Sequence, residues 1–285
     1  MKILICGHRA YAARGLGKLL KANGYDVLCF SRSKDGKDRT AIESTGDKVI
    51  LGNVLEVDGN QYLLSEKIDV IINFILMEGA SEEDNLKYVR SLCRLADKVG
   101  AQKLIHMSSI SSYANDEKLI TESTPIDSHP EWKGCYGAIK VKVDNLLLEC
   151  KMNTRVVMMR PGFITAPDKK NALAGIAKIL PGGFAVLMGN KKSTLPLCER
   201  DDLHQAMLDA IESKNPKPVY VLVGNGEGTK YSYLKQTLPE VKVIKLPKFP
   251  VVGFAWMLKA IKVFDERKYQ MVKGLFKVQK FNVNS

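Results

Sequence analysis

Short apolar runs alternate with amphipathic stretches along most of the chain. Runs that suit buried strands lie at 2–6, 26–31, 48–51, 69–74, 103–107, 155–159 and 219–224. Between them, apolar residues recur at helical spacing in 14–23, 82–99, 136–149 and 202–213. Strands and helices in alternation predict βαβ units, in which the strands form a parallel sheet and the helices cover its faces. The pattern therefore predicts an α/β fold with a doubly wound, Rossmann-like parallel sheet.

The loop after the first apolar run has the spacing of a glycine-rich loop. In the sequence GHRAYAA at 7–13, only Gly7 is glycine, and alanine fills the other two places of G-x-x-G-x-x-G. Folds that bind dinucleotides place small residues here, so that the backbone can approach a pyrophosphate at the start of a helix. We predict a cofactor cradle at Gly7, Ala10, Tyr11 and Ala12, in which Ala10 keeps a negative φ. The alternative is an ordinary turn between a strand and a helix.

The end of the second predicted strand bears on the choice of cofactor. Folds that bind NAD commonly place an acid here, where it binds the ribose 2′-hydroxyl. In this chain the sequence is SRSK at 31–34, without an acid. Arg32, together with Arg9 from the preceding loop, has the chemistry to hold a 2′-phosphate by charge-assisted hydrogen bonds. This favours NADP(H), while NAD(H) stays open, and a solvated basic turn is the alternative.

Tyr136 and Lys140 are the first candidates for catalysis. They lie four residues apart in a predicted helix, so that both side chains project from one face. A nearby positive charge lowers the pKa of a tyrosine from its usual value of about 10. Tyr136 could then act as an acid or a base on a hydroxyl or carbonyl group. Such a pair also occurs by chance on helix surfaces, so the surrounding motifs decide its meaning.

A cluster of serines follows the predicted strand at 103–107. The sequence SSISSY occupies 108–113. In open α/β sheets, ligands bind just beyond the carboxyl ends of the strands. The hydroxyl groups of this cluster are therefore candidates for binding a ligand.

Taken in order, several stretches resemble the extended short-chain dehydrogenase/reductase family, and within it the NAD(P)-dependent epimerase/dehydratase group that acts on nucleotide sugars. The resemblance covers about 1–225 and rests on ILICGHRAYAARGL, GNVLEVDG, DVIINF, HMSSISSYA, YGAIK, RPGFITAP and ERDDLHQAMLDAI. The Gly-His-Arg opening is similar to that of GDP-fucose synthases, which use NADP. The resemblance implies a Rossmann-like fold and a nucleotide-sugar substrate.

The resemblance also implies roles for individual residues. It implies Ser109, four residues before Tyr113, as the catalytic serine, Tyr136 as the acid/base, and Lys140 as the residue that binds the nicotinamide ribose. Besides the cradle, the two arginines, Tyr136 and Lys140, the implied cofactor-binding residues are Asn53, Val54, Phe74 and Pro161. The implied substrate-binding residues are Ser109, Ser111, Tyr136 and Gly162.

These features predict two parts of unequal size. Residues 1–164 form the expected dinucleotide-binding domain, to which 196–224 return. Residues 165–195 and 225–285 form the expected substrate lobe. A chain of 285 residues is long enough for one large domain with such a lobe.

Composition narrows the setting of the protein. There is no run of about 18 apolar residues, and the N-terminal MKILICGHR is typical of a strand and not of a signal peptide. Six cysteines and four histidines without ligand spacing lead us to expect reduced thiols, a cytoplasmic protein and no metal. The net charge of +12 suits an anionic partner. Because no nucleic-acid motif accompanies this charge, we favour an anionic small molecule.

The segment 245–280 combines basic and apolar residues. It holds nine lysines and arginines against two acids, among apolar residues that include Phe254, Trp256, Leu258, Ile261 and Phe264. A basic amphipathic helix can lie on an anionic membrane surface. The favoured interpretation is a helix that packs on its own lobe with solvated lysines, and phosphate binding by one or two lysines is compatible with it. A homodimer also stays open.

Two classes of function remain. The first is an NAD(P)-dependent oxidoreductase or epimerase that transfers hydride at a sugar carbon of a nucleotide sugar, with Tyr136 as acid/base. The second is a non-catalytic NAD(P)-binding sensor or scaffold, because a fold does not fix a function. The set of Ser109, Tyr136 and Lys140 favours the enzyme, whereas the altered glycine loop favours the sensor. A dehydratase is the least favoured reaction, because no acid accompanies Ser109 in SIS at 109–111; epimerisation and reduction both stay open.

Overall fold

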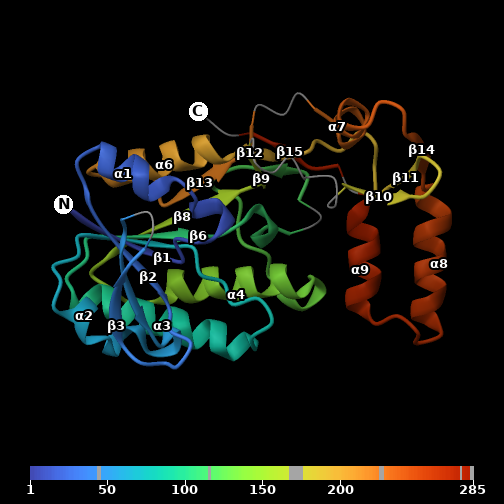
Figure 1. Cartoon of the computed structure of the whole chain (residues 1–285). Coiled ribbons are helices and arrows are strands. Elements are labelled where there is room, and N and C mark those ends of the chain that lie inside the picture. Colours follow the sequence, from blue (N-terminus) through green and yellow to red (C-terminus); the bar gives the residue numbers. More distant parts are fainter. Residues whose placement is uncertain (44–45, 115–116, 167–175, 225–227, 277, 283–285) are drawn as a thin grey trace. The chain divides into compact units, whose positions relative to one another are not determined.

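The computed structural model describes residues 1–43, 46–114, 117–166, 176–224, 228–276 and 278–282 (Figure 1). The chain divides into two compact units. Unit 1 comprises 1–108, 142–160 and 202–220, and unit 2 comprises 109–141, 161–201 and 221–285. Sequence alone places 109–141 in the dinucleotide-binding domain. In the structure this segment groups with unit 2, where its strand β7 (Leu119–Ile120) pairs with β15 (Lys280–Phe281).

An eight-stranded sheet organises unit 1. Its order is β13-β8-β6-β5-β1-β2-β4-β3. The strands are β1 (Lys2–Cys6), β2 (Asp26–Arg32), β3 (Arg39–Ile42), β4 (Lys48–Gly52), β5 (Val70–Asn73), β6 (Lys103–Met107), β8 (Arg155–Pro161) and β13 (Val219–Leu222). The pairs β1–β2, β1–β5, β2–β4, β5–β6 and β6–β8 are parallel. The predicted Rossmann-like α/β fold is therefore confirmed, and the strand order changes direction between β1 and β5, where such sheets bind ligands.

The central strands are buried because their apolar residues are continuous. Residues 3–5 of β1 are at most 1% exposed, and all four residues of β5 are buried. A strand needs such a run when helices cover both faces of its sheet. Helices α1 (Leu16–Ala22) and α6 (Arg200–Glu212) lie on one face (Figure 1). Helix α3 (Glu82–Lys98) and the later part of α4 (Cys135–Glu149) lie on the other.

Two features of unit 1 differ from the pattern of the sequence. Helix α1 begins at Leu16, because Gly15 takes a left-handed φ of 91° that a continuous helix does not contain. A short 3-10 helix, η1 (Tyr11–Ala13), precedes this glycine. The antiparallel edge strand β3 was not predicted, because its sequence RTAI is mostly exposed and contains no apolar run.

Unit 2 contains a second, smaller sheet. Its strands are β10 (Ala177–Leu180), β11 (Phe184–Leu187) and β14 (Lys242–Lys245), in the order β10-β11-β14. Helix α7 (Lys230–Thr237) contributes Leu234 to a buried cluster with Ile176, Ala177, Ala185, Leu187, Leu195 and Val241. A further pair of strands, β9 (Phe163–Thr165) and β12 (Leu197–Glu199), is parallel. None of these strands was predicted individually from the sequence.

Two helices near the C-terminus replace the single basic helix that the sequence predicted. Helices α8 (Lys248–Ala260) and α9 (Glu266–Leu275) lie side by side (Figure 1). The carboxylate of Asp265 caps α9 by accepting the backbone N–H of Lys268. Among the residues that the structure describes, no helix has the length and apolar content that crossing a membrane requires.

Candidate functional site

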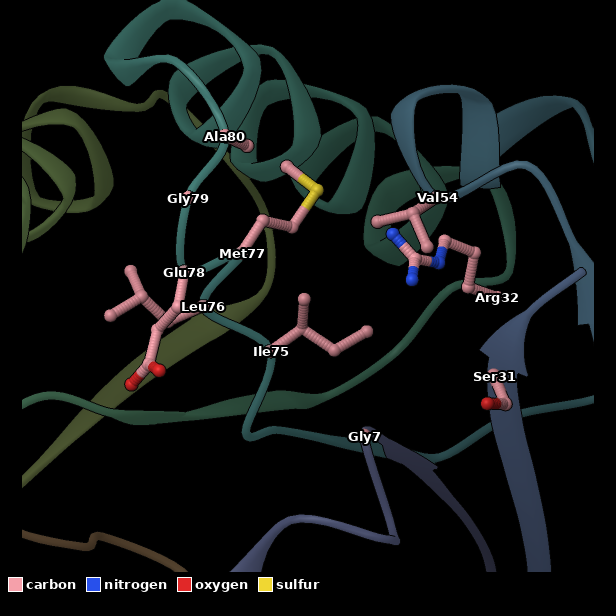
Figure 2. Close-up of a pocket in the computed structure, with 10 residues that line it drawn as sticks. All are labelled: Gly7, Ser31, Arg32, Val54, Ile75, Leu76, Met77, Glu78, Gly79 and Ala80. Atoms are coloured by element: carbon pink, nitrogen blue, oxygen red, sulfur yellow. The ribbon is translucent and has the colours of Figure 1, made fainter. Parts of the chain in front are cut away.

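A cavity of about 580 Å³ opens in unit 1 where β1 and β2 end (Figure 2). This volume lies in the usual range of small-molecule pockets, roughly 300–1,000 Å³. Its walls are formed by Gly7, Ser31, Arg32, Val54, Ile75, Leu76, Met77, Glu78, Gly79 and Ala80. The cavity therefore lies at the carboxyl ends of parallel strands, where open α/β sheets bind their ligands.

Gly7 lets the backbone come close at this cavity. Its φ is 82°, a left-handed conformation that side chains disfavour. A Cβ added to Gly7 would lie 2.9 Å from Ile75 Cγ1 and 3.3 Å from the Ile75 nitrogen. Glycine is therefore required here both by the backbone conformation and by the lack of space for a Cβ. A backbone without a side chain can also approach the pyrophosphate of a dinucleotide closely. The residues present fit a dinucleotide.

The segment 75–80 forms one wall of the cavity, and Asn73 fixes where that wall begins. Asn73 Oδ1 accepts the Ile75 backbone N–H at 3.0 Å and the Tyr88 hydroxyl at 2.7 Å. Asn73 Nδ2 lies 3.0 Å from His106 Nδ1. Asn73, Tyr88 and His106 are each at most 2% exposed, so these polar groups satisfy one another in the core.

Asn85, on helix α3, holds the same wall from the other side. Its Oδ1 accepts the Met77 backbone N–H at 2.9 Å, and its Nδ2 donates to the Met77 carbonyl at 3.2 Å and the Ser81 carbonyl at 3.0 Å. Ser81 caps the helix by accepting the Asp84 N–H. Asn85 is 2% exposed. Neither Asn73 nor Asn85 was predicted as a site residue, because an asparagine in a strand or helix has no fixed meaning by itself.

Arg32 is the basic side chain on this cavity. Figure 2 shows its guanidinium beside Val54, with the Glu78 carboxylate directed away from it. Within the described part of the chain, the Arg32 side chain makes no hydrogen bond or ion pair. An unengaged guanidinium on a cavity wall is suited to an anionic ligand group.

Arg9 lies elsewhere. It lines a second cavity of unit 1, of about 650 Å³, together with His8, Glu43 and other residues. Arg9 Nε donates to Glu43 Oε1 at 2.9 Å, and His8 Nε2 lies 3.1 Å from the same oxygen. The hydrogen bond from Arg9 is the main cause that holds the pKa of Glu43 below its usual value. The structure therefore does not bring Arg9 and Arg32 to one cavity, although the sequence grouped them.

The alanines of the glycine loop are not strained. Ala10 has φ −60° and ψ 146°, and among the described residues Lys262 is the only non-glycine residue with positive φ. The Ala10 N–H donates to the Gly7 carbonyl at 2.9 Å, and the Ala12 carbonyl lies 2.8 Å from His204 Nε2. The prediction that Ala10 keeps a negative φ is confirmed. Of the predicted cradle, Gly7 lines the first cavity, whereas Ala10, Tyr11 and Ala12 do not.

The other predicted cofactor residues differ in their surroundings. Val54 lines the first cavity, whereas the Asn53 side chain caps the 3-10 helix η2 (Val54–Gly59) by accepting the Leu55 N–H at 3.0 Å. Phe74 is 7% exposed, and its N–H donates to the Cys6 carbonyl at 2.9 Å. Pro161 ends β8. Their roles toward a cofactor stay predictions.

Tyr136 and Lys140 lie on the first turns of α4, as predicted. The Lys140 ammonium is 5.8 Å from the centroid of the Tyr136 ring, a distance at which a cation and a ring attract each other. Lys140 is 4% exposed, whereas Tyr136 is 47% exposed. The arrangement keeps the buried charge close to the ring and leaves the tyrosine accessible to solvent.

A buried ion pair anchors α4 four residues beyond Lys140. Arg160 Nη2 lies 3.1 Å from Asp144 Oδ2, and the Ser108 hydroxyl donates to the same oxygen at 2.6 Å. The side chains of Arg160 and Asp144 are 2% and 0% exposed. Removing one member of a buried pair is costly, because the other charge stays buried. This cluster was not predicted from the sequence, although Asp144 stands at i+4 from Lys140 and Arg160 follows an apolar run.

Ser109 and Ser111, the two serines predicted to bind substrate, lie in unit 2. Ser109 Oγ accepts the Ser111 N–H at 3.1 Å and caps the 3-10 helix η3 (Ile110–Ser112). A hydroxyl that accepts one N–H keeps its own proton for a ligand oxygen. Ser111 lines a cavity of about 320 Å³, with Lys133, Gly134, Gly137, Lys230, Met271, Gly274 and Leu275. This cavity borders the first turn of α4, next to Tyr136 in the sequence.

Two lysines of this cavity have different environments. Lys133 is 4% exposed, lies 2.9 Å from Asp127 Oδ2 and donates to the Tyr113 carbonyl at 2.7 Å. Lys230 begins helix α7, and its ammonium has no ion-pair partner among the described residues. Burial lowers the pKa of Lys230. Lys133 is thus tied into the fold, whereas Lys230 is available to an anionic group. The sequence did not single out either lysine.

Gly162 has a steric reason to be glycine. A Cβ at this position would lie 2.0 Å from the Pro196 carbonyl oxygen. The neighbouring Phe163 N–H donates to that same oxygen at 2.7 Å, which draws the two backbones together beside the β9–β12 pair. The predicted contact of Gly162 with a substrate stays a prediction.

Comparison with known proteins identifies the family. The model of the NAD dependent epimerase/dehydratase family matches residues 3–224. The chain belongs to this family. No curated protein matches the chain.

Several solved structures share the fold of this chain. The structure of gox2253 is 17% identical to this chain, with a TM-score of 0.71. The match covers 98% of this chain and 89% of the gox2253 chain. A short-chain dehydrogenase/reductase superfamily protein from Agrobacterium tumefaciens with bound NAD is 14% identical, with a TM-score of 0.65 and coverage of 86% and 85%. A UDP-glucuronic acid 4-epimerase mutant from Bacillus cereus, in complex with NAD and a fluorinated UDP-sugar acid, is 17% identical, with a TM-score of 0.63 and coverage of 86% and 86%.

The family assignment confirms the resemblance that the sequence motifs indicated. At such low identities, the likeness to solved structures shows a shared fold, and function must be argued from the residues of this chain.

Proposed function

We propose that this protein transfers hydride at a sugar carbon of a nucleotide sugar, as an NAD(P)-dependent epimerase or ketoreductase. Family membership supports an NAD-dependent activity. The observation that carries the proposal is the pair on α4, where the buried Lys140 ammonium lies 5.8 Å from the ring of the accessible Tyr136. A purely binding protein has no use for a proton donor held in this way.

The three predicted catalytic residues have distinct roles. A nicotinamide cofactor, when bound, supplies or accepts the hydride. In the oxidative direction the Tyr136 oxygen takes the proton of the sugar hydroxyl, and in reduction it returns a proton to the carbonyl oxygen. Ser109 donates a hydrogen bond to that same oxygen and orients it. Lys140 binds the nicotinamide ribose and stabilises negative charge on the Tyr136 oxygen.

The cofactor would bind in the unit 1 cavity. Gly7 provides the close backbone for the pyrophosphate, and Asn73 and Asn85 fix the wall formed by 75–80. Arg32 has no other partner within the described residues and would bind a 2′-phosphate, which favours NADP(H) over NAD(H). Several structural neighbours contain NAD, and this likeness concerns those proteins.

The substrate would use the unit 2 cavity. Lys230 would face the diphosphate or another anionic group of a nucleotide sugar, because its ammonium lacks an acid partner among the described residues. Ser111 and Gly137 would border the sugar. Among the neighbours, one epimerase was solved with a UDP-sugar acid, which agrees with this class of substrate. The absence of an acid in 109–111 makes dehydration the least favoured outcome.

The test combines binding and turnover. NADP(H) and NAD(H) are titrated into the purified chain, and a panel of nucleotide sugars is then incubated with the preferred cofactor. We expect saturable cofactor binding, together with a spectroscopic change at the nicotinamide or an epimerised product. Cofactor binding without any turnover across the panel would support the sensor or scaffold instead. The structure weakens that alternative, because the altered glycine loop is unstrained at Ala10.

Tyr136→Phe isolates the acid/base step. The variant keeps the ring above Lys140 and removes the hydroxyl. We expect turnover to fall roughly 10²–10⁴-fold, with cofactor affinity within about twofold of the parent. Single-turnover rates and dinucleotide titration measure the two quantities. Turnover close to that of the parent would remove Tyr136 from the mechanism. Tyr113→Phe, on the buried tyrosine near the serine cluster, serves as the control for loss of a phenol.

A further inference from the structure

The exposed face of helix α8 is apolar. Phe249, Phe254 and Trp256 are 86%, 59% and 61% exposed, and Met257 and Ile261 at the end of the helix are 45% and 61% exposed. At about 100° per residue, these five side chains fall within an arc of roughly 160°. They therefore form one continuous face, which we call the α8 face.

The opposite side of α8 is apolar too, and it packs inward. Ala255 is 3% exposed, and Val251, Val252 and Leu258 are partly buried. A surface helix normally turns its apolar side to the core and a polar side to water. One apolar side of α8 packs on the protein itself. The α8 face is left exposed, and an exposed apolar face of this kind is typical of a surface that contacts another apolar partner.

The charge around the α8 face has one sign. From 241 to 264 the sequence contains Lys242, Lys245, Lys248, Lys259 and Lys262 and no acid. Lys248 and Lys262 stand just before and just after the face in sequence, and neither pairs with an acid among the described residues. Lys259 differs, because it pairs with Glu266 of α9. An apolar surface with an unpaired lysine at each end is complementary to an apolar environment that carries negative charge.

Lys262 occupies a position that glycine prefers. Its φ is 59°, and the N–H groups of Lys262 and Val263 donate to the carbonyls of Lys259 and Leu258, at 2.9 Å each. This is the hydrogen-bond pattern that ends many helices, usually with glycine in the left-handed position. A lysine is strained in this left-handed conformation, so a lysine here lowers local stability relative to glycine. The positive charge at the end of the α8 face is therefore present despite a cost in stability.

We propose that unit 2 docks through the α8 face onto the surface of an anionic phospholipid bilayer. The helix of 13 residues is about 20 Å long, too short to cross the hydrocarbon core of about 30 Å. It would lie in the plane of the interface, with Phe249, Phe254 and Trp256 among the acyl chains and the lysines at the headgroups. Tryptophan and lysine suit this boundary, because each combines an apolar body with a polar end.

A second copy of the chain fits this face less well. In a symmetric dimer the same patch meets itself. The lysines at the ends of one α8 face would then approach those of the other, with no acid from 241 to 264 to neutralise them. Lipid headgroups such as phosphatidylglycerol supply the missing negative charge. The proposal is also independent of catalysis, because none of the residues that line the two proposed ligand cavities comes from α8.

The primary test is binding of the full chain to vesicles. We expect it to cosediment with vesicles of phosphatidylcholine mixed with phosphatidylglycerol, and to bind at least about tenfold more weakly to phosphatidylcholine alone. Added salt should weaken the binding, because screening reduces attraction to the headgroups. The chain has two tryptophans, so in a Trp132→Phe background the emission of Trp256 should shift to the blue when vesicles are added.

Variants test which residues carry the binding. Lys248→Gln combined with Lys262→Gln should weaken binding to the anionic vesicles roughly 25-fold, at about fivefold for each lysine near the surface. Phe249→Ser combined with Phe254→Ser should weaken it by at least about tenfold. Unit 1 offers matched controls in Ile42→Ser, at a residue 72% exposed, and in the exposed Lys151→Gln. Both controls should bind as the parent does.

Lys262→Gly separates binding from folding. Glycine removes the left-handed strain, so the melting temperature should rise, while vesicle binding should fall about fivefold. Weaker binding in a more stable protein could not be attributed to unfolding. If Lys262→Gly binds as tightly as the parent, its charge has no part in docking.

Three outcomes would overturn the proposal. They are equal binding to the neutral and anionic vesicles, equal binding by the parent and the Phe249→Ser/Phe254→Ser variant, and a parent dimer in solution that this variant dissolves. The last result would assign the α8 face to a second copy. Dinucleotide affinity is measured on each variant and should not change.

Discussion

Arg32 and Arg9 were both predicted to bind one 2′-phosphate, but they lie on different cavities. Arg32 lines the cavity of Gly7 and Val54, whereas Arg9 is bound to Glu43 on another cavity. A guanidinium recognises a phosphate through paired, charge-assisted hydrogen bonds that a hydroxyl does not replace. Arg32 is therefore our candidate for recognising a 2′-phosphate.

We predict that Arg32→Ala lowers affinity for NADP⁺ by roughly ten- to a hundredfold, which corresponds to the loss of one or two charged hydrogen bonds. Affinity for NAD⁺ should change by less than about threefold. Calorimetric titration of both dinucleotides gives the two ratios. Arg9→Ala is the matched control and should leave the NADP⁺ to NAD⁺ ratio unaltered. A ratio that depends on Arg9 and not on Arg32 would reverse the assignment.

At the scale of elements, the cavity wall at 75–80 depends on helix α3 through Asn85. This side chain binds both polar groups of the Met77 backbone and the Ser81 carbonyl. A segment without regular hydrogen bonds stays in place when buried side chains supply those bonds. Asn85 thus connects the start of a helix with the shape of a ligand cavity.

Asn85→Ala should loosen this wall. We expect dinucleotide affinity to fall about tenfold and the free energy of unfolding to fall by about 1–3 kcal/mol, because three hydrogen bonds are lost at a buried site. Titration and denaturant unfolding measure the two effects. Lys87→Ala, at an exposed position of the same helix, should change neither by much. If the Asn85 variant is destabilised but binds the dinucleotide normally, the wall does not contribute to the cofactor site.

A second contact joins η2 to α3 through Asp58. Arg94 Nε donates to Asp58 Oδ2 at 2.8 Å, the Ser91 hydroxyl donates to Oδ1, and Lys98 donates to the Asp58 carbonyl at 2.8 Å. Burial by itself raises the pKa of Asp58, but the hydrogen bonds from Arg94 and Ser91 outweigh it, so the net pKa is lowered. The Asp58 side chain is 14% exposed, so solvent screens this contact only in part.

This lowered pKa predicts a dependence of stability on pH. A carboxylate with a lowered pKa in the folded state stabilises the protein above its unfolded pKa of about 3.9, and this contribution is lost as the pH falls below that value. Asp58→Asn should lower the free energy of unfolding by about 1–3 kcal/mol at pH 7, and the difference from the parent should shrink between about pH 5 and pH 3. Glu83→Gln breaks the exposed pair with Arg90 and should cost at most about 0.5 kcal/mol. A constant difference across this pH range would contradict the role of the charge.

The sequence predicts elements well where one physical requirement dominates. Strands such as β5 are buried on both faces and therefore consist of continuous apolar residues, which can be recognised without knowledge of the fold. Strands such as β3 and β14 are mostly exposed, so their sequences RTAI and KVIK carry no comparable signal. Helix α8 was expected to turn its lysines to water and its apolar side chains to its own lobe; Lys248 is exposed, but so are the aromatic side chains of Phe249, Phe254 and Trp256. Such a face depends on what lies outside the chain, which a pattern of local residues does not encode.

At the scale of the whole molecule, the structure groups some of the residues that the sequence proposed for a site, and their roles stay predictions. Gly7, Arg32 and Val54 line the unit 1 cavity, and Tyr136 and Lys140 meet on α4, because motif spacing and helical periodicity place them. The wall at 75–80 and the buried Asp144–Arg160 pair were missed, since both depend on contacts between segments distant in sequence. Lys230 was missed for the same reason. Local motifs therefore point to candidate residues, and contacts between distant segments determine what surrounds them.

The division into two units leads to a last prediction about the whole chain. The candidate cofactor cavity consists of unit 1 residues alone, and β10, β11 and α7 belong to unit 2 with their own buried cluster. Dinucleotide at about 100 times its Kd should add about 2.7 kcal/mol to the free energy of unfolding of the part that binds it. Hydrogen exchange should therefore slow in 75–80 and in the loop after β1. Exchange in β10, β11 and α7 should stay as in the free protein. Arg32→Ala with NADP⁺ should lose most of the slowing at the same dinucleotide concentration. Slowing confined to β10, β11 and α7 would show that the dinucleotide binds unit 2 and that the unit 1 cavity serves another ligand.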